Sequence, residues 1–399
     1  MKVLWVNTNF MHPTTKGGQI RTLEMLRHLH RWNEIHFVAI ENLAEPEGPA
    51  RSREYCFRAY PMQHRIPPKN SIGFVRQLAR GLVSSMPVAV ERFHSAELGR
   101  FLEDLVRKEH FDRAVLDFLP PTAYFPYPER SLLFQHNVET MIWRRHVEHA
   151  QDPLRKLYFR RQAHLMYEYE RRVCRAAGHI VAVSANDAEQ MRKLFGVTRV
   201  SEIPTGVNLE YFAPPASVPR VADLVFVGSM DWLPNVDGVM YFAEEILPLI
   251  RRRRPDCTLA IVGRTPPLKI RQLAERDPKI QVTGTVSDVR GYLWGSAVSI
   301  VPLRIGGGTR LKIYEAMAAK IPVVSTSVGA EGLTVQPPEN IRIADTPESF
   351  AQSCIELLED DAERARVAES AWEMVSACFS WEKVARQFER ILEAAPSLN

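Results

Sequence analysis

The sequence has little cysteine, and its five cysteines are scattered without a CxxC pair: Cys56, Cys174, Cys257, Cys354 and Cys378. This pattern excludes a disulfide framework and a zinc site, and it predicts buried free thiols. The chain also lacks a run of about 18 apolar residues, the length that a membrane-spanning helix needs. Its first residues, MKVLWVNTNF, are typical of a strand rather than of a secretion signal. We therefore expect a cytoplasmic protein.

Neither sign of charge is in large excess. The 51 Lys and Arg residues against 47 Asp and Glu leave a net charge of +4, too little to make nucleic acid the expected partner. No Asp-x-Asp pair occurs, so a metal ion is not expected at the site. The glycines near residue 17 lack the GxGxxG spacing of an NAD-dependent dehydrogenase. The sequence thus predicts no metal, no cofactor and no nucleic acid partner.

Short apolar runs alternate with segments of helical period along the whole chain. In the first half these runs are 3–6, 35–40, 114–118, 132–134 and 180–183. In the second half they are 224–227, 259–262, 280–282, 298–301 and 323–325. Such alternation is typical of parallel sheets covered by helices on both faces. We predict an α/β protein with two doubly wound, Rossmann-like domains that face each other across a cleft.

The boundary between the domains is expected at a proline-rich stretch. Residues 212–219 contain three prolines, which prevent regular structure and favour a linker at 212–221. The N-terminal domain would then span 1–211 and the C-terminal domain 222–379. Residues 380–399 contain an amphipathic helix with Ser380 as its N-cap, able to dock on either domain.

The richest candidate site is the segment 305–317, IGGGTRLKIYEAM, between a predicted strand and a predicted helix. Its loop consists of Gly306, Gly307, Gly308 and Thr309. Glycine amides, the helix N-terminus and the cations Arg310 and Lys312 together predict a diphosphate site. Glu315, one turn into the helix, could accept hydrogen bonds from ribose hydroxyls. The alternative is a glycine turn followed by a solvated charged face.

Two other loops follow predicted strands. Gly17 and Gly18 could present amides to a phosphate or a sugar, with Lys16 and Arg21 nearby, although a simple turn explains this pair equally well. Gly228 and Ser229 could contact phosphate in the same way. The neighbouring Asp231 and Asn235 could instead only cap the helix that follows.

Three polar residues follow the strand at 132–134. His136 at the carboxyl end of a strand can donate or accept a hydrogen bond near neutral pH, and Asn137 and Glu139 follow it. The alternative is a structural histidine. Further on, residues 144–175 hold nine Lys and Arg residues among aromatic and aliphatic ones. This segment either rests on an anionic membrane or forms a solvated helix on its own domain.

The combination of motifs resembles the retaining family 4 glycosyltransferases of GT-B fold over nearly the whole length. The motifs are Gly17-Gly18, His136-Asn137, IPTGVN at 203–208, Gly228-Ser229 and GGGTRLKIYE at 306–315. The chain is most similar to bacterial exopolysaccharide sugar transferases that carry a GGGTRLK segment. This resemblance implies a nucleotide-sugar donor, UDP- or GDP-linked, in the C-terminal domain, and a glycan or lipid-linked acceptor.

The resemblance also implies roles for individual residues. Arg310 and Lys312 would lie near the diphosphate, Glu315 near the ribose and the backbone around Val286 near the base. His136 would face the donor sugar, while the Gly17-Gly18 loop would close on the reaction centre. The acceptor-side candidates are Lys16, Arg21, Asn137 and Glu139. The last helix would cross back to the N-terminal domain.

The sequence departs from the family pattern at two positions. Gly307 stands where the family's Glu-x7-Glu pattern has its first acid, and Asn235 stands roughly where a lysine follows the Gly228 loop. Our interpretation is that the GGGTRLK variant moves its cations to Arg310 and Lys312. Two alternatives are a nucleotide-sugar epimerase and a catalytically weakened nucleotide-binding scaffold subunit.

Overall fold

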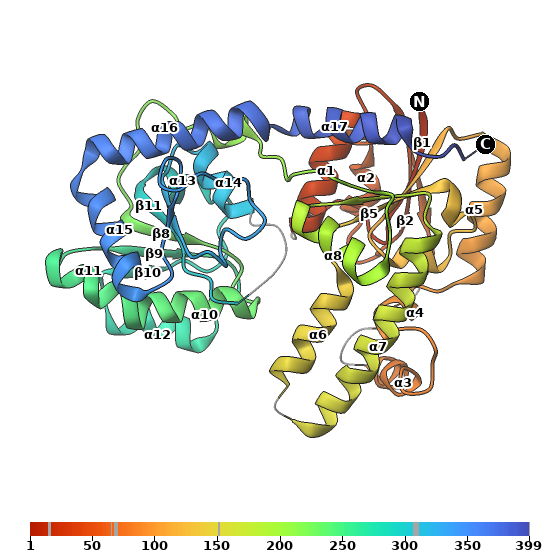
Figure 1. The fold of residues 1–399 in the computed structure, drawn as a ribbon, viewed down its shortest axis with the longest axis horizontal. Coiled ribbons are helices and arrows are strands. Elements are labelled where there is room, and N and C mark those ends of the chain that lie inside the picture. The colour runs from red at the N-terminus through yellow and green to blue at the C-terminus, as the bar shows by residue number, and fades with distance from the viewer. Residues whose placement is uncertain (15–16, 65, 68–70, 151, 306–310, 399) are drawn as a thin grey trace. The chain divides into compact units, whose positions relative to one another are not determined.

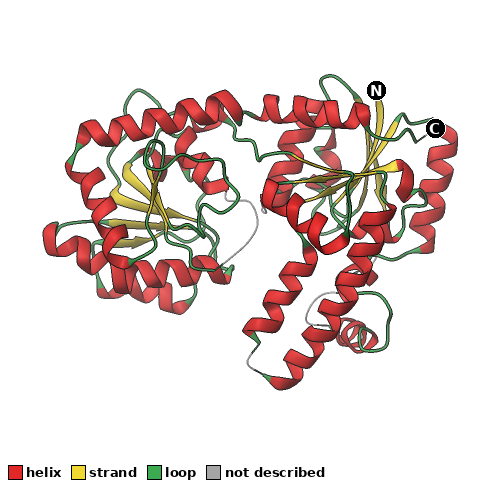
Figure 2. Ribbon diagram, viewed as in Figure 1, coloured by secondary structure: helices red, strands yellow, loops and turns green. Residues whose placement is uncertain are grey.

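The computed structural model describes the chain apart from residues 15–16, 65, 68–70, 151, 306–310 and 399. The chain forms two compact units, Met1–Pro204 with Val384–Asn399 (unit 1) and Thr205–Lys383 (unit 2). In each unit a parallel sheet lies between helices, as the yellow strands and red helices of Figure 2 show. The predicted α/β fold with two doubly wound domains is confirmed.

The sheet of unit 1 has seven strands in the order β3-β2-β1-β4-β5-β6-β7, and all its pairs are parallel. Its strands are β1 Lys2–Val6, β2 Glu34–Ile40, β3 Arg58–Met62, β4 Arg113–Asp117, β5 Ser131–Gln135, β6 His179–Ala182 and β7 Val200–Glu202. Central strands of such a sheet are apolar on both faces. Strand β1 fits this rule, since all residues from Val3 to Val6 are fully buried.

Helices cover both faces of this sheet, labelled in Figure 1. They are α1 Gly17–Leu29, α2 Glu47–Ala50, α3 Ile72–Arg80, α4 Val88–Glu91, α5 Ala96–Glu109, α6 Glu139–His149, α7 Pro153–Ala176 and α8 Ala185–Phe195. The last helix, α17 Trp381–Ala394, returns to unit 1 as expected. Its Phe388 is fully buried, with ring centroids 5.5 Å from Trp5 and 5.2 Å from Phe134. The Lys383 N–H donates to Ser380 Oγ at 3.4 Å, so Ser380 caps the helix as predicted.

Unit 2 repeats the plan with six parallel strands in the order β10-β9-β8-β11-β12-β13. Its strands are β8 Ala222–Val227, β9 Leu259–Val262, β10 Ile280–Val282, β11 Ser296–Val301, β12 Val323–Ser325 and β13 Arg342–Ile343. Its helices are α9 Leu209–Phe212, α10 Leu233–Tyr241, α11 Leu247–Arg253, α12 Leu268–Arg276, α13 Arg290–Trp294, α14 Leu311–Ala318, α15 Pro347–Glu359 and α16 Asp361–Cys378. A π-helical turn, Phe242–Ile246, joins α10 to α11.

The segment predicted to be the linker, 212–221, instead belongs to unit 2. Phe212 is 6% exposed in the core of that unit, and its carbonyl accepts a hydrogen bond from Trp294 Nε1 at 2.8 Å. The Val221 N–H donates to the Gly295 carbonyl at 2.6 Å. The prolines prevent regular structure here, but they do not prevent packing. The chain therefore passes between the units at 204–205 and 383–384 rather than at 212–221.

Two further sequence expectations concern thiols and membrane spans. Cys56, Cys174, Cys257 and Cys354 are buried free thiols as predicted, whereas Cys378, near the end of α16, is exposed. None of the helices in the described part of the chain is both long and apolar enough to span a bilayer.

Candidate active site

The register of the central strands of unit 1 fixes where its polar residues meet. Val6 of β1 pairs with Leu116 of β4, and Asp117 at the end of β4 pairs with Phe134 of β5. The carboxyl ends of these three strands therefore lie at one edge of the sheet. Open parallel sheets bind ligands at this edge. The first candidate site, the His136 cluster, consists of Asp117, Phe118 and His136 at this edge.

Asp117 is the centre of the hydrogen bonds in this cluster. Its carboxylate is fully buried and lies 2.8 Å from His136 Nε2. It also accepts hydrogen bonds from Trp5 Nε1 at 3.0 Å, Asn7 Nδ2 at 2.6 Å and Thr22 Oγ1 at 2.8 Å. These groups are donors here, so the carboxylate acts only as an acceptor. Sequence analysis placed Asp117 inside an apolar strand and assigned it no role.

His136 is held by stacking as well as by Asp117. Its ring lies 3.8 Å from that of Phe118 at an interplanar angle of 13°, and its residue is 4% exposed. Burial lowers the pKa of His136, against the opposing effect of Asp117. A neutral ring that donates from Nε2 leaves Nδ1 as an acceptor. Nδ1 is buried, and none of the described residues forms a hydrogen bond with it.

Gly18 acts through packing in this structure. A Cβ at Gly18 would lie 2.6 Å from Cζ of Phe118, the residue stacked on His136. Gly17 is the exposed first residue of α1. Arg21 lies inside unit 1 at 2% exposure, and burial lowers its pKa to about 9, opposed by Asp187 and Asp117. Lys16 lies outside the described residues.

The residues after His136 are fixed by a carboxylate that sequence analysis overlooked, Glu170 of α7. Fully buried, it accepts hydrogen bonds from the backbone N–H of Glu139 at 3.0 Å and of Thr140 at 2.8 Å. It also accepts from Thr140 Oγ1 at 2.6 Å and Gln135 Nε2 at 3.3 Å. Glu170 thus caps the N-terminus of α6 and anchors both ends of the loop that carries His136 and Asn137.

Glu139, the first residue of α6, is held in a similar environment. Burial raises its pKa to about 7, while the Arg92 guanidinium opposes the shift. A carboxyl group with such a pKa can exchange a proton near neutral pH. Of the acceptor-side candidates, Asn137 lies on the loop after His136 and Glu139 begins the helix that follows it.

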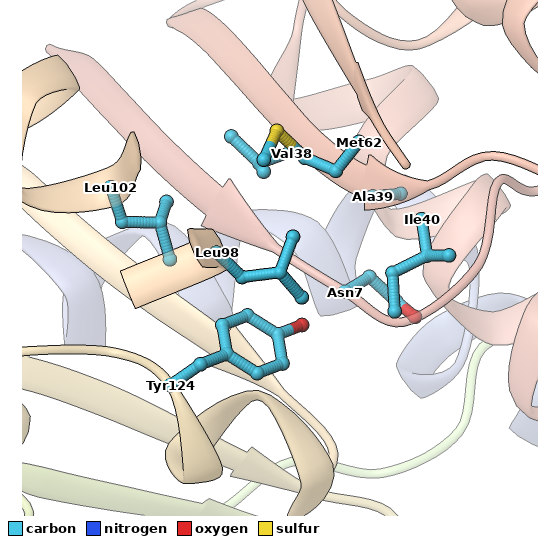
Figure 3. Close-up of a pocket in the computed structure, with 8 residues that line it drawn as sticks. All are labelled: Asn7, Val38, Ala39, Ile40, Met62, Leu98, Leu102 and Tyr124. Carbon is cyan, nitrogen blue, oxygen red and sulfur yellow. The ribbon is translucent and has the colours of Figure 1, made fainter. Parts of the chain in front are cut away.

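A small pocket adjoins the His136 cluster through Asn7 (Figure 3). The space between its mostly aliphatic walls is about 190 Å³ when the part open to solvent is included, and it is too narrow to enclose a water molecule. The lining residues are Asn7, Val38, Ala39, Ile40, Met62, Leu98, Leu102 and Tyr124. This pocket was not predicted from the sequence, because its residues come from five separate segments.

The second candidate site, the Lys312 site, lies at the carboxyl end of β8 in unit 2 and consists of Gly228, Ser229, Asn235 and Lys312. Asn235 is 4% exposed and donates from Nδ2 to the Ser229 carbonyl at 2.7 Å. A Cβ at Gly263 would lie 1.8 Å from the Gly228 carbonyl oxygen, so only glycine fits there. This close approach fixes the turn after β8, and sequence analysis missed it.

Lys312 of α14 reaches this turn with its ammonium group. Nζ donates to Asn235 Oδ1 at 2.9 Å and lies 4.3 Å from the centre of the Phe226 ring. A Cβ at Gly228 would lie 2.6 Å from Nζ, so this glycine leaves room for the cation. Asn235, which stands roughly where the family pattern has a lysine, thus accepts a hydrogen bond from the ammonium of Lys312.

The other donor-side predictions lie around this site or outside the described residues. Glu315 follows Lys312 by one turn, and burial raises its pKa to about 7, opposed by the Lys312 ammonium. Ser229 accepts a hydrogen bond from Arg264 Nε at 2.7 Å, and Val286 packs against the core of unit 2. The predicted residues Gly306, Gly307, Gly308, Thr309 and Arg310 lie outside the described part.

Two family models match the chain. The model described as "Glycosyl transferases group 1" matches residues 222–360, in unit 2, and "Glycosyltransferase Family 4" matches 130–211, which includes His136. Together they cover more than half of the sequence. The chain is a glycosyltransferase of the family 4 type. The sequence-based recognition of this family is confirmed at that level.

Individual proteins resemble this chain over nearly its whole length. A 44.6 kDa protein of the cps region of Klebsiella pneumoniae is 21% identical over 96% of this chain and 97% of its own. Sucrose-phosphate synthase of Thermosynechococcus elongatus has a TM-score of 0.68 at 18% identity, covering 99% of this chain and 98% of its own. Anabaena HepE, solved with UDP and glucose, has a TM-score of 0.64 at 12% identity, covering 99% and 100%. The structural matches establish the GT-B fold of this glycosyltransferase.

Proposed function

We propose that this glycosyltransferase moves a sugar from a UDP- or GDP-linked donor to a glycan or lipid-linked acceptor, with retention of configuration. The observation that carries the proposal is the ammonium of Lys312 beside the Gly228 turn, held by Asn235 at 2.9 Å. A cation and backbone amides at the carboxyl end of a parallel strand suit a diphosphate. The binding of UDP and glucose by the structural neighbour HepE supports a nucleotide-sugar donor.

The charges that develop in the transition state determine which groups of the protein can accelerate the reaction. When the bond between C1 of the sugar and the diphosphate oxygen breaks, negative charge grows on that oxygen and positive charge on the sugar. Lys312, Arg310 and the amides of Gly228, Ser229 and the 306–309 loop would stabilise the leaving group, so that no metal is required. Glu315 would bind the ribose, and the backbone around Val286 the base.

Unit 1 would bind the reacting sugar and the acceptor. The acceptor-capable Nδ1 of His136 suits a hydroxyl of the donor sugar, because it is buried and none of the described residues occupies it. The Gly17-Gly18 loop would close on this sugar. Lys16, Arg21, Asn137 and Glu139 stay candidates for the acceptor side. In a front-face reaction, the acceptor oxygen bonds to C1 while its proton passes to the departing diphosphate oxygen.

A screen of UDP-, GDP- and ADP-sugars tests the proposal. We expect nucleotide release together with an extended acceptor whose new linkage keeps the donor's anomeric configuration, measured by NMR. Appearance of an epimerised donor would instead support the epimerase. Tight nucleotide binding without turnover would support the scaffold.

Two substitutions test the assigned roles. Arg310→Ala should lower kcat by about 10²- to 10³-fold, as removal of one preorganised charge does elsewhere. His136→Ala should lower turnover more than nucleotide affinity. Near-wild-type kcat in the first variant, or a pure loss of affinity in the second, would contradict the assignment.

We place the enzyme in the cytoplasm, acting in cell-surface polysaccharide synthesis.

A further inference from the structure

Helices α6 and α7 form a hairpin that projects from the sheet of unit 1 (Figure 1). Aromatic rings fill the inside of this hairpin. The ring of Phe159 lies 6.2 Å from Trp143 and 5.5 Å from His146. Packing against α6 therefore involves the inner side of α7. It does not account for the apolar side chains on the outer side of α7.

Large exposed apolar side chains are concentrated here. Of the thirteen such side chains among the described residues, six lie in segments 71–86 and 141–164, about a tenth of the chain. They are Ile72, Val75, Leu82, Val83, Leu154 and Leu157, between 54% and 82% exposed. We call these six residues the apolar face. Single exposed apolar residues need no explanation, but a concentration of this kind marks an interaction surface.

Hydrogen bonds bring the two segments together. Leu154, Leu157 and Arg161 are spaced i, i+3, i+7 and lie on one side of α7. Arg161 donates to the Ser84 carbonyl at 2.9 Å, and the fully buried Gln162 donates to the Gly81 carbonyl at 2.9 Å. The turn that carries Leu82 and Val83 is thus fixed to the side of α7 that presents Leu154 and Leu157.

Positive charge is concentrated in the two segments that carry the apolar face. Segments 71–86 and 141–164 hold eight Lys and Arg residues and two acids, a net +6 where the whole chain has +4. Within the described ranges, Arg76, Arg155, Lys156 and Arg160 form no ion pair. Two copies of a surface with this charge repel each other, which disfavours self-association. An anionic bilayer offers phosphate groups to the cations and an acyl boundary to the leucines.

We propose that the apolar face and its cations dock the protein on an anionic lipid membrane. Long basic side chains would extend to the headgroups while the aliphatic residues enter the interface. The enzyme would then work at the surface where a lipid-linked acceptor lies. Docking itself does not depend on sugar transfer, so it is tested without any activity measurement.

Vesicle flotation of the full-length protein tests docking. We expect flotation with vesicles of equal parts phosphatidylcholine and phosphatidylglycerol, none with phosphatidylcholine alone, and release by high salt. Each basic residue near an anionic surface contributes about a factor of five to binding. The variant Arg155→Gln/Lys156→Gln/Arg160→Gln should therefore lower the partition coefficient by about a hundredfold. Leu154→Gln/Leu157→Gln should also lower it.

A matched control lies in unit 2. Helix α12 carries the exposed Leu268, 62% exposed, beside the exposed Lys269 and Arg271. The variant Leu268→Gln/Lys269→Gln/Arg271→Gln should float like the wild type. Circular dichroism melting would confirm that all variants fold. The proposal is overturned if the wild type does not float with anionic vesicles, or if the control loses binding as much as the α7 variants.

Discussion

The two units build their sheets in the same strand order, yet they place opposite charges at the carboxyl ends of the strands. In unit 1 the end of β4 carries the buried carboxylate of Asp117, with four hydrogen-bonding partners. In unit 2 the end of β8 lies beside the ammonium of Lys312, which donates to the amide oxygen of Asn235. The comparison teaches that the shared fold fixes where loops meet, whereas the residues after each strand decide the chemistry.

Moving the cation of unit 2 tests this contrast most strongly. Lys312→Ala should lower kcat by about 10²- to 10³-fold, because it removes a preorganised positive charge from the leaving group. If the position of the charge matters and not the helix that carries it, adding Asn235→Lys to that variant should restore part of kcat. The measurement is steady-state nucleotide release.

The matched control for this test is Lys269→Ala, an exposed lysine of α12, which should leave kcat unchanged. Full activity of Lys312→Ala would contradict the role of the cation. Failure of Asn235→Lys to restore any activity would show that Lys312 acts through more than its charge.

Replacing the carboxylate of Asp117 by an amide tests the role of this residue as an acceptor in unit 1. In Asp117→Asn the amide group would face buried donors such as Trp5 Nε1 and Asn7 Nδ2. Each donor left unpaired should lower the free energy of unfolding by about 1–3 kcal/mol. Urea denaturation measures this loss. The control is Asp256→Asn, whose side chain is 97% exposed and which should change the free energy of unfolding little. Equal stability of both variants would contradict the role of Asp117 as the shared acceptor of these hydrogen bonds.

The sequence predicted the interior of both sheets but only one of their four edge strands, β10. The three strands it missed, β3, β7 and β13, all lie at a sheet edge. Edge strands contact solvent, and β3, with no buried residue, lacks the continuous apolar run that identifies a central strand. The linker prediction failed for a different reason. A proline-rich sequence indicates that the backbone is irregular, but it does not indicate whether a residue such as Phe212 is buried.

The candidate sites show a similar limit. The strand-to-loop positions of Gly228 and His136 were visible in the sequence, because a glycine or a polar residue follows an apolar run. The roles of Asp117, Glu170 and Gly263 were not visible. They depend on partners far away in the sequence, such as Trp5 for Asp117 and Gly228 for Gly263. Tertiary pairing of this kind leaves no local pattern.

A smaller change tests whether packing in unit 1 supports its cluster. Gly18→Ala should press its Cβ against Phe118 and lower the free energy of unfolding by about 1–3 kcal/mol through overpacking. It should also lower turnover, because Phe118 stacks on His136. Thermal denaturation and nucleotide release measure the two effects. Gly291→Ala, a helical position with nothing within 4 Å of the added Cβ, should instead keep or slightly raise stability. Equal effects of both substitutions would show that Phe118 yields freely.

The pH dependence of stability separates the buried acid of α7 from an exposed one. Burial raises the pKa of Glu170 to about 8 in the folded protein, against an ordinary value of 4.5. Between these values the folded state keeps a proton that the unfolded state has released. The free energy of unfolding therefore falls as pH rises through this window, by up to about 1.4 kcal/mol per pH unit.

Glu170→Gln removes the titrating group, so its free energy of unfolding should depend less on pH between 5 and 8 than that of the wild type. Urea denaturation across this range measures the difference in slope, which a constant loss of hydrogen bonds does not change. Glu168→Gln, on the same helix with a side chain 51% exposed, should keep the wild-type slope. Parallel pH profiles for Glu170→Gln and the wild type would mean that the four accepted hydrogen bonds outweigh burial, and that Glu170 is ionised in the folded protein.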